Sequence, residues 1–330
     1  MNLSKIQDSW KNRRVERFQE IFSQYGTILV ILFLGGIFSV TTDHFSSTAN
    51  LQNILRQISI TSIVAIGMTL VILIGGIDLS VGSVVLFSAA AMNSLIFNQI
   101  LPTVPAVVVG LLAASFIGFL NGVLIEKARI SPVVVTLSSM TAARGLGQMI
   151  LWINNSWLWV REPFFVYIKT QSWWVIPVPA GIMIILYILA YIIMTQTRFG
   201  RYVYAIGNNQ LAAKLTGVAI TRVKVMIYSL SGFFAGIGGI LMSARLSAIS
   251  PGVGQGLEFD AITAVILGGT SLSGGVGKVQ KTILGAIIVG MILNYMTIKG
   301  ISAHYQRAVT GFIILAAAIL DRFSQGKNRT

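Results

Sequence analysis

The sequence has no cysteine, only two histidines and few charged side chains. Without cysteine the chain forms no disulfide, offers no thiolate nucleophile and holds no metal through sulfur. The two histidines, His44 and His304, are far apart in the sequence, and the apolar stretches contain no histidine to pair with a nucleophilic serine. We therefore expect no metal site and no catalytic centre.

Charge is scarce as well. Charged residues make up 10% of the 330 residues and hydrophobic residues 55%, whereas about 25% of a typical soluble domain is charged. With a mean hydropathy of +0.79 the chain has too little polar surface to coat a soluble globule. Apolar stretches of about 17 to 25 residues, the length that crosses a bilayer, recur along it. This pattern predicts a membrane protein with several spans.

The predicted fold class is all-α, a polytopic transmembrane bundle of about ten segments that includes short, glycine-interrupted helices. One transmembrane domain is expected to cover residues 1–330. The segment at 259–267 is too short to cross a hydrocarbon core about 30 Å thick by itself. The ten segments are residues 25–40, 58–74, 81–101, 104–125, 132–153, 174–195, 225–242, 259–267, 283–298 and 308–320.

The net charge of +14 is explained by the loops between these segments rather than by a nucleic-acid partner. If both termini are cytoplasmic, the cytoplasmic loops hold 17 of the 24 Lys and Arg and the opposite loops hold six, as the positive-inside rule requires. Residues 1–24 lack the cleavage pattern of a signal peptide, and we expect them to form a cytoplasmic amphipathic lead-in. Several tryptophans bracket the longest external loop, as is typical of the headgroup level.

Two stretches of the sequence are alike. VILIGGIDLSVGS (71–83) and AVILGGTSLSGGVG (264–277) are both apolar runs that end in Gly-Gly and continue into Leu-Ser. Four identities recur at an offset of 193 residues. Paired glycine-interrupted segments often mark the transport path of a carrier with two related halves. The alternative is that Gly-Gly followed by serine is ordinary loop chemistry.

Few ionisable residues lie within the apolar segments. Asp78 could be functional, because a charge at membrane depth is costly, but a capping role ahead of the next span is favoured. Arg144 is the basic residue that lies well inside a span, and a structural pairing is expected for it. Glu258 and Asp260 open a helical segment, where acids complement the helix dipole, although either could be the partner of Arg144.

Small residues recur in two of the segments. They lie at 110–122 and at 232–239, and this spacing predicts close helix packing.

The longest basic loop, at 196–224, contains no acidic residue. Asn208 and Asn209 can cap a short helix at 210–215 that Gly217 closes. A capped helix between two spans has no evident membrane purpose, so it is interpreted as a docking element for a soluble partner. The alternative is an ordinary positive-inside loop, which would require only the charges.

Three stretches carry a resemblance to a known family. VAIGMTLVILIGGIDLSVGS, TRFGRYVYAIGNNQLAAKLTGV and FDAITAVILGGTSLSGGVGKVQKTILGAIIVG resemble the ribose-type carbohydrate permeases of bacterial ABC importers, over about residues 45–321. The resemblance implies a permease homodimer in the inner membrane, with a periplasmic sugar-binding protein outside. It also implies a cytoplasmic tandem-domain ATPase that binds ATP and Mg. This chain contains no Walker A motif and is itself expected to bind no cofactor.

The resemblance implies a set of functional positions. The ATPase-coupling positions are Gly207, Asn208, Asn209, Ala212, Ala213, Lys214, Leu215 and Gly217. The translocation-path positions are Gly75, Gly76, Asp78, Ser80, Thr270, Ser271 and Ser273. The expected substrate is a monosaccharide, ribose before other pentoses or hexoses. The alternatives are a permease for another small polar solute, such as a branched-chain amino acid, and a secondary carrier.

Overall fold

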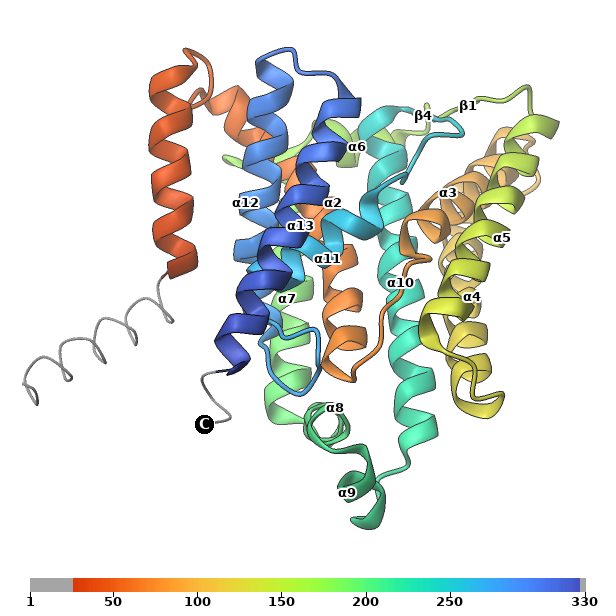
Figure 1. Cartoon of the computed structure of the whole chain (residues 1–330). Coiled ribbons are helices and arrows are strands. Elements are labelled where there is room, and N and C mark those ends of the chain that lie inside the picture. The colour runs from red at the N-terminus through yellow and green to blue at the C-terminus, as the bar shows by residue number, and fades with distance from the viewer. Residues whose placement is uncertain (1–25, 327–330) are drawn as a thin grey trace, which may run out of the picture.

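A computed structural model describes residues 26–326, so the predicted lead-in at 1–24 lies outside the described residues. The described part is almost wholly helical (Figure 1). Its helices are Gly26–Thr41, α2 (Thr48–Leu73), α3 (Val81–Phe97), α4 (Thr103–Lys127), α5 (Pro132–Ile153), α6 (Pro163–Thr170), α7 (Val178–Gln196), α8 (Arg198–Asn208), α9 (Gln210–Leu215), α10 (Ile220–Leu246), α11 (Leu257–Leu267), α12 (Val279–Ile298) and α13 (Ala303–Gly326).

Strands are minor in this region. β1 (Leu158–Trp159) pairs antiparallel with β4 (Ala248–Ile249), and β2 (Ser172–Trp173) pairs antiparallel with β3 (Ile176–Pro177). The all-α membrane bundle predicted from the sequence is therefore confirmed. Five of the described helices, α2, α4, α7, α10 and α12, are long and apolar enough to cross a membrane.

The predicted segments reappear with shifted ends. α5 has the predicted bounds, whereas α2 begins ten residues before the predicted segment at 58–74. Its polar first turns are helical because the Ser47 side chain accepts the backbone N–H of Asn50 at 3.3 Å and so caps the helix. Two helices, α6 and α8, were not predicted.

α11 is too short to span a membrane, and α3 is at the lower limit of the spanning length. α3 has 17 residues and α11 has 11. At a rise of 1.5 Å per residue α11 is about 16 Å long, close to half the hydrocarbon thickness of about 30 Å. The prediction that this segment does not cross by itself is confirmed. Figure 1 shows α11 at mid-height of the bundle, followed by a loop that descends before α12 begins.

α2 forms the centre of the bundle. It packs against α7, α10, α11 and α12, and most of its residues from Ile58 to Leu73 are buried. α10 contacts both α2 and α4 and so joins the centre to the outer group of α3, α4 and α5 (Figure 1).

Glycines bring α4 and α10 close together. A Cβ at Gly118 would overlap the backbone carbonyl of Tyr228, and a Cβ at Gly232 would overlap that of Ala114. The close packing predicted from the small residues at 110–122 and 232–239 is thus confirmed. Direct backbone contact of this kind is the usual way in which small residues hold membrane helices together.

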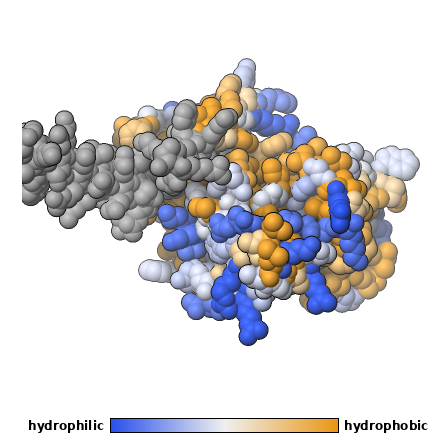
Figure 2. All heavy atoms as spheres, turned by 60° about the horizontal axis from the view of Figure 1, so that its bottom comes forward, coloured by the Kyte–Doolittle hydropathy of each residue, from blue (hydrophilic) through white to orange (hydrophobic). Residues whose placement is uncertain are grey.

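The two ends of the bundle differ. α8, α9 and the α4–α5 connection share one end, called here the α8–α9 end, and α6 lies at the other (Figure 1). Hydrophilic residues gather on the α8–α9 end, while apolar residues cover much of the sides (Figure 2). Exposed basic residues at this end include Lys127, Arg129, Arg198, Arg201, Lys214 and Arg222.

The α4–α10 contact predicts a stability difference between two glycine substitutions. Gly118→Ala places a methyl group against the Tyr228 carbonyl and should cost about 1 to 3 kcal/mol. Gly145→Ala, on α5, meets nothing within 4 Å and serves as the matched control. Thermal unfolding of the detergent-solubilised protein should show a lower Tm for the first variant alone, and equal Tm values would contradict the packing argument.

Candidate functional site

Two short helices form the α8–α9 element. The Thr197 hydroxyl lies 3.5 Å from the Gly200 N–H at the start of α8, and the Asn209 side chain accepts the Ala212 N–H at 3.0 Å at the start of α9. Gly217 follows α9 with φ +83°, a conformation that suits glycine. The predicted helix at 210–215, with its Asn cap and glycine end, is confirmed. α8 buries Val203 and Ile206 against the bundle.

α9 presents apolar side chains at a hydrophilic end. Leu211 is 68% exposed and Leu215 is 81% exposed, while Ala213 is buried. Exposed leucines on a capped helix at this end suit contact with another protein rather than with water. Leu215 was among the predicted coupling residues, and Leu211 was missed although it belongs to the same helix.

Lys224 connects the α8–α9 element to the bundle. Its Nζ donates to Gln210 Oε1 of α9 at 3.0 Å and lies 2.8 Å from Glu126 Oε1 of α4. The Lys224 and Glu126 side chains are only 13% and 11% exposed, so water screens the ion pair weakly. The start of α9, the start of α10 and the end of α4 are therefore held together.

The two similar glycine segments, 71–83 and 264–277, meet next to α8. The Gly275 N–H donates to the Leu73 carbonyl at 2.9 Å, which joins the loop after α11 to the end of α2. Gly274 and Gly275 adopt φ +82° and +74°, which permits this approach. A Cβ at Gly207 of α8 would overlap both the Leu73 carbonyl oxygen and the Gly275 nitrogen. We call this meeting of Leu73, Gly207 and Gly275 the glycine junction.

Side chains of α8 add to the glycine junction. Tyr204 Oη donates to the Gly277 carbonyl at 3.0 Å, and Asn208 Nδ2 lies 3.5 Å from the Gly275 carbonyl. Burial raises the pKa of the Tyr204 phenol above its usual value. α8 thus contacts both segments of the suggested repeat.

Asp78 lies in a closed polar network. It is 1% exposed and accepts the Ser80 N–H at 3.0 Å, the Ser80 hydroxyl at 2.6 Å and the Ser231 hydroxyl at 2.8 Å. Asn121 Nδ2 donates to Ser80 Oγ at 3.1 Å, and Ser139 donates to the Asn121 side chain. The carboxylate therefore anchors the loop before α3 to α4, α5 and α10.

The other predicted path positions are distributed around the same loops. Thr270 and Ser271 are buried and Ser273 is exposed. None of the seven predicted path residues lines the cavities described next. Their role in translocation stays a prediction.

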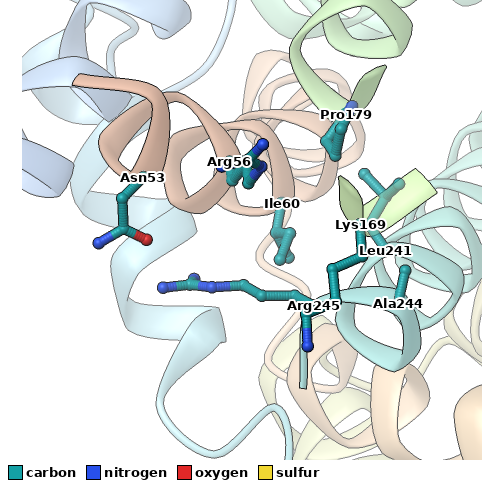
Figure 3. A pocket seen from close by; sticks show the side chains of 8 residues that line it. All are labelled: Asn53, Arg56, Ile60, Lys169, Pro179, Leu241, Ala244 and Arg245. Carbon is teal, nitrogen blue, oxygen red and sulfur yellow. The ribbon is translucent and has the colours of Figure 1, made fainter. Parts of the chain in front are cut away.

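Two neighbouring cavities lie between α2 and α10, each of about 250 Å³. The α6 cavity (Figure 3) is lined by Asn53, Arg56, Ile60, Lys169, Pro179, Leu241, Ala244 and Arg245. The α11 cavity is lined by Gln57, Ile60, Thr61, Met242, Arg245, Leu246, Gly252, Val253, Gly254, Gln255, Leu257 and Asp260. A third, the α13 cavity, of about 660 Å³, lies between α11, α12 and α13 and shares Gln255 and Asp260 with the α11 cavity.

Sequence reasoning missed most of these polar linings. Gln57 and Thr61 lie four residues apart and so share one face of α2, which was the available signal. Gln57 falls just before the predicted segment at 58–74 and was assigned to a loop. Arg245 was counted as a loop charge, and Asp260 was interpreted as an acid that complements a helix dipole or as a partner of Arg144.

Arg144 holds the loop that precedes α11. Its Nε donates to Ser83 Oγ at 3.2 Å and its Nη1 to the Val253 carbonyl at 2.7 Å. Within residues 26–326 it forms no ion pair with Glu258 or Asp260, although Glu258 interacts with it electrostatically. The expected structural role is confirmed, with a carbonyl and a hydroxyl as the direct partners.

Comparison with known proteins identifies the family. The model of the family described as "Branched-chain amino acid transport system / permease component" matches residues 50–318. The chain belongs to this family. No solved structure matches the permease.

Curated relatives extend this result. The permease is 38% identical to a ribose import permease protein of Bacillus subtilis, over 92% of this chain and 94% of the relative. It is 38% identical to the ribose import permease protein of Escherichia coli K12, over 91% and 94%. It is 33% identical to the L-arabinose transport system permease protein of Escherichia coli K12, over 95% and 94%. The resemblance inferred from the sequence is confirmed.

The glycine junction predicts local loosening when Gly207 gains a side chain. In Gly207→Ala the methyl group should push α8 away from Leu73 and Gly275, and the Gly275 amide should then exchange hydrogen with solvent faster. Hydrogen–deuterium exchange of peptides covering 204–209 and 271–277 measures this. Gly311→Ala on α13, which meets nothing within 4 Å, should leave both peptides unchanged. Unchanged exchange in Gly207→Ala would contradict the junction.

Proposed function

We propose that this permease is the membrane-spanning subunit of an ATP-driven importer for a monosaccharide, with ribose as the first candidate. A binding protein delivers the sugar from outside, and a separate ATPase binds ATP and Mg on the cytoplasmic side. Two copies of the permease form the channel. The ribose and arabinose permeases among its relatives support the substrate class.

The observation that carries the proposal is the α8–α9 element. α9 carries exposed Leu211 and Leu215 for the ATPase, and α8 rests through Gly207 on the backbone of both glycine segments. Movement of the ATPase against α9 then reaches α2 and the loop after α11 through main-chain contacts. Lys224 joins α9 to α4 and α10 in the same movement.

The orientation follows the charges. We place the α8–α9 end in the cytoplasm, because exposed basic residues gather there, and with it both termini. The membrane is then the cytoplasmic (inner) membrane of a bacterium.

Two alternatives remain within transport. The description of the matched family favours a branched-chain amino acid as cargo. A secondary carrier would need a coupling carboxylate that can gain and lose an ion. Asp78 suits this poorly, because serine hydroxyls and a backbone N–H surround it. Asp260 lines the α11 and α13 cavities and has no ion pair among the described residues, so the transport measurement below separates the two functions.

Charged substitutions on α9 test the docking proposal. Leu211→Glu and Leu215→Glu place a carboxylate on the proposed ATPase-binding face and should abolish co-purification with the ATPase, because a desolvated unpaired charge costs several kcal/mol. Both side chains are exposed, so the permease itself should keep its Tm. Ala213 is buried and is a poor choice for this test.

The matched control is Thr221→Glu. Thr221 is exposed at the same end, in the first turn of α10, where an acid complements the helix dipole. It should retain the ATPase. If the leucine variants also retained it, α9 would not be the docking site.

Reconstituted transport separates the candidate functions. Proteoliposomes that contain the permease and its ATPase, supplied with the binding protein, should take up ribose only when ATP is provided. Uptake of leucine in place of ribose would favour the amino-acid permease. Uptake driven by an ion gradient alone would favour the secondary carrier.

A further inference from the structure

The α11 cavity is open to the surface and has a polar lining. Five of its lining side chains are polar: Gln57, Thr61, Arg245, Gln255 and Asp260. Together they offer a carboxylate, a guanidinium, two amides and a hydroxyl around about 250 Å³. A cavity lined by several convergent polar side chains is a candidate ligand site.

The charges that line this cavity do not neutralise each other. Within residues 26–326 no ion pair joins Arg245 to Asp260. The hydrogen bond that the structure gives the Arg245 guanidinium is a long one, 3.5 Å from Nη2 to Gln57 Oε1. Figure 3 shows Arg245 extended across the space between α2 and α10, with Arg56 above it on α2. The amide oxygen of Gln255 accepts from Arg307 Nη2 at 3.2 Å, so the Asp260 carboxylate and the Arg245 guanidinium are the groups most available to a small molecule.

One wall of the cavity is fixed independently of any ligand. Residues 252–255 form this wall, and Gly254 adopts φ +70° where it approaches the backbone of Gly82 closely. Arg144 holds the Val253 carbonyl at 2.7 Å from the side of α5. Arg144 is thus a positioning residue for the cavity, which it reaches only through the backbone of Val253.

We propose that the α11 cavity binds the monosaccharide during its passage, an inference that rests on the proposed function. Asp260 accepts hydrogen bonds from sugar hydroxyls, and Arg245 and the amide N–H groups of Gln57 and Gln255 donate to them. The volume is below the range of about 300 to 1,000 Å³ that is typical of sites for drug-sized ligands, which suits a single sugar ring. The Arg245 guanidinium and the Asp260 carboxylate also complement the carboxylate and ammonium of an amino acid, so the test below compares ribose with leucine directly.

The absence of cysteine allows a direct test. Thr61→Cys places the sole thiol of the chain in the cavity, and Ser46→Cys places it in the exposed turn before α2, outside the three cavities. The assembled complex in proteoliposomes is treated with a charged thiol reagent, with saturating D-ribose or with leucine at the same concentration. Ribose should slow modification of Thr61→Cys at least about fivefold, and it should leave Ser46→Cys unchanged. Equal rates with and without ribose at Thr61→Cys, or equal protection by leucine, would overturn the proposal.

A transport measurement completes the test. Asp260→Asn keeps the side-chain volume and removes the charge, and uptake at low ribose concentration should fall about 10- to 100-fold, the effect of losing a hydrogen bond to a charged group. Asp43→Asn, exposed in the turn before α2, is the control and should transport normally. Tm and co-purification with the ATPase should be retained in both variants.

The outcomes separate the inference from the function on which it rests. If the unmodified permease transports no ribose, the proposed function fails. If it transports ribose normally while Asp260→Asn is equally active, the inference fails and the proposed function stands. If Asp260→Asn misfolds, ribose protection at Thr61→Cys decides the question.

Discussion

The structure depends on one constraint: a helix that stops inside a membrane protein must give its main-chain polar groups to other partners. An unsatisfied backbone group in hydrocarbon costs several kcal/mol. Here α11 stops at Leu267 after 11 residues, and the loop that follows it descends to the end of α2 at the α8–α9 end (Figure 1). The Leu73 carbonyl receives the Gly275 N–H at 2.9 Å, so the loop after one short helix satisfies the end of the central one. The arrangement of α2, α11 and α12 follows from this pairing.

The same pairing explains why α8 occupies its place. The backbone of the two glycine turns lies so close to α8 that a Cβ at position 207 would overlap it. The helix face at this point therefore has to be a glycine. Gly207 provides that face, and Tyr204 and Asn208 add contacts to the Gly277 and Gly275 carbonyls beside it. The exposed leucines of α9 and the buried backbone of α2 are thereby parts of one connected unit, with Lys224 as the link to α4.

Local sequence signals predicted the elements that local forces decide. The proline start of α5, the Asn209 cap of α9 and the shortness of the segment at 259–267 could all be read directly, and the small residues of α4 and α10 predicted their close contact. α8 was missed because its amphipathic pattern of Val203 and Ile206 lies in a basic loop without long apolar runs. The α11 cavity could not be predicted, because Gln57, Arg245 and Asp260 come from three helices that only tertiary packing brings together. The role of the predicted path residues, such as Asp78 and Thr270, stays a prediction.

The glycine junction is built almost entirely from main-chain atoms, which every residue type supplies alike. The walls of the α11 cavity are built from side chains, which differ with each substitution. If, as proposed, the glycine junction transmits movement, that part of the molecule is chemically separate from the part proposed to contact cargo. Residues at positions like Gln57 and Asp260 could then be exchanged for a new solute without altering the backbone contacts of the junction.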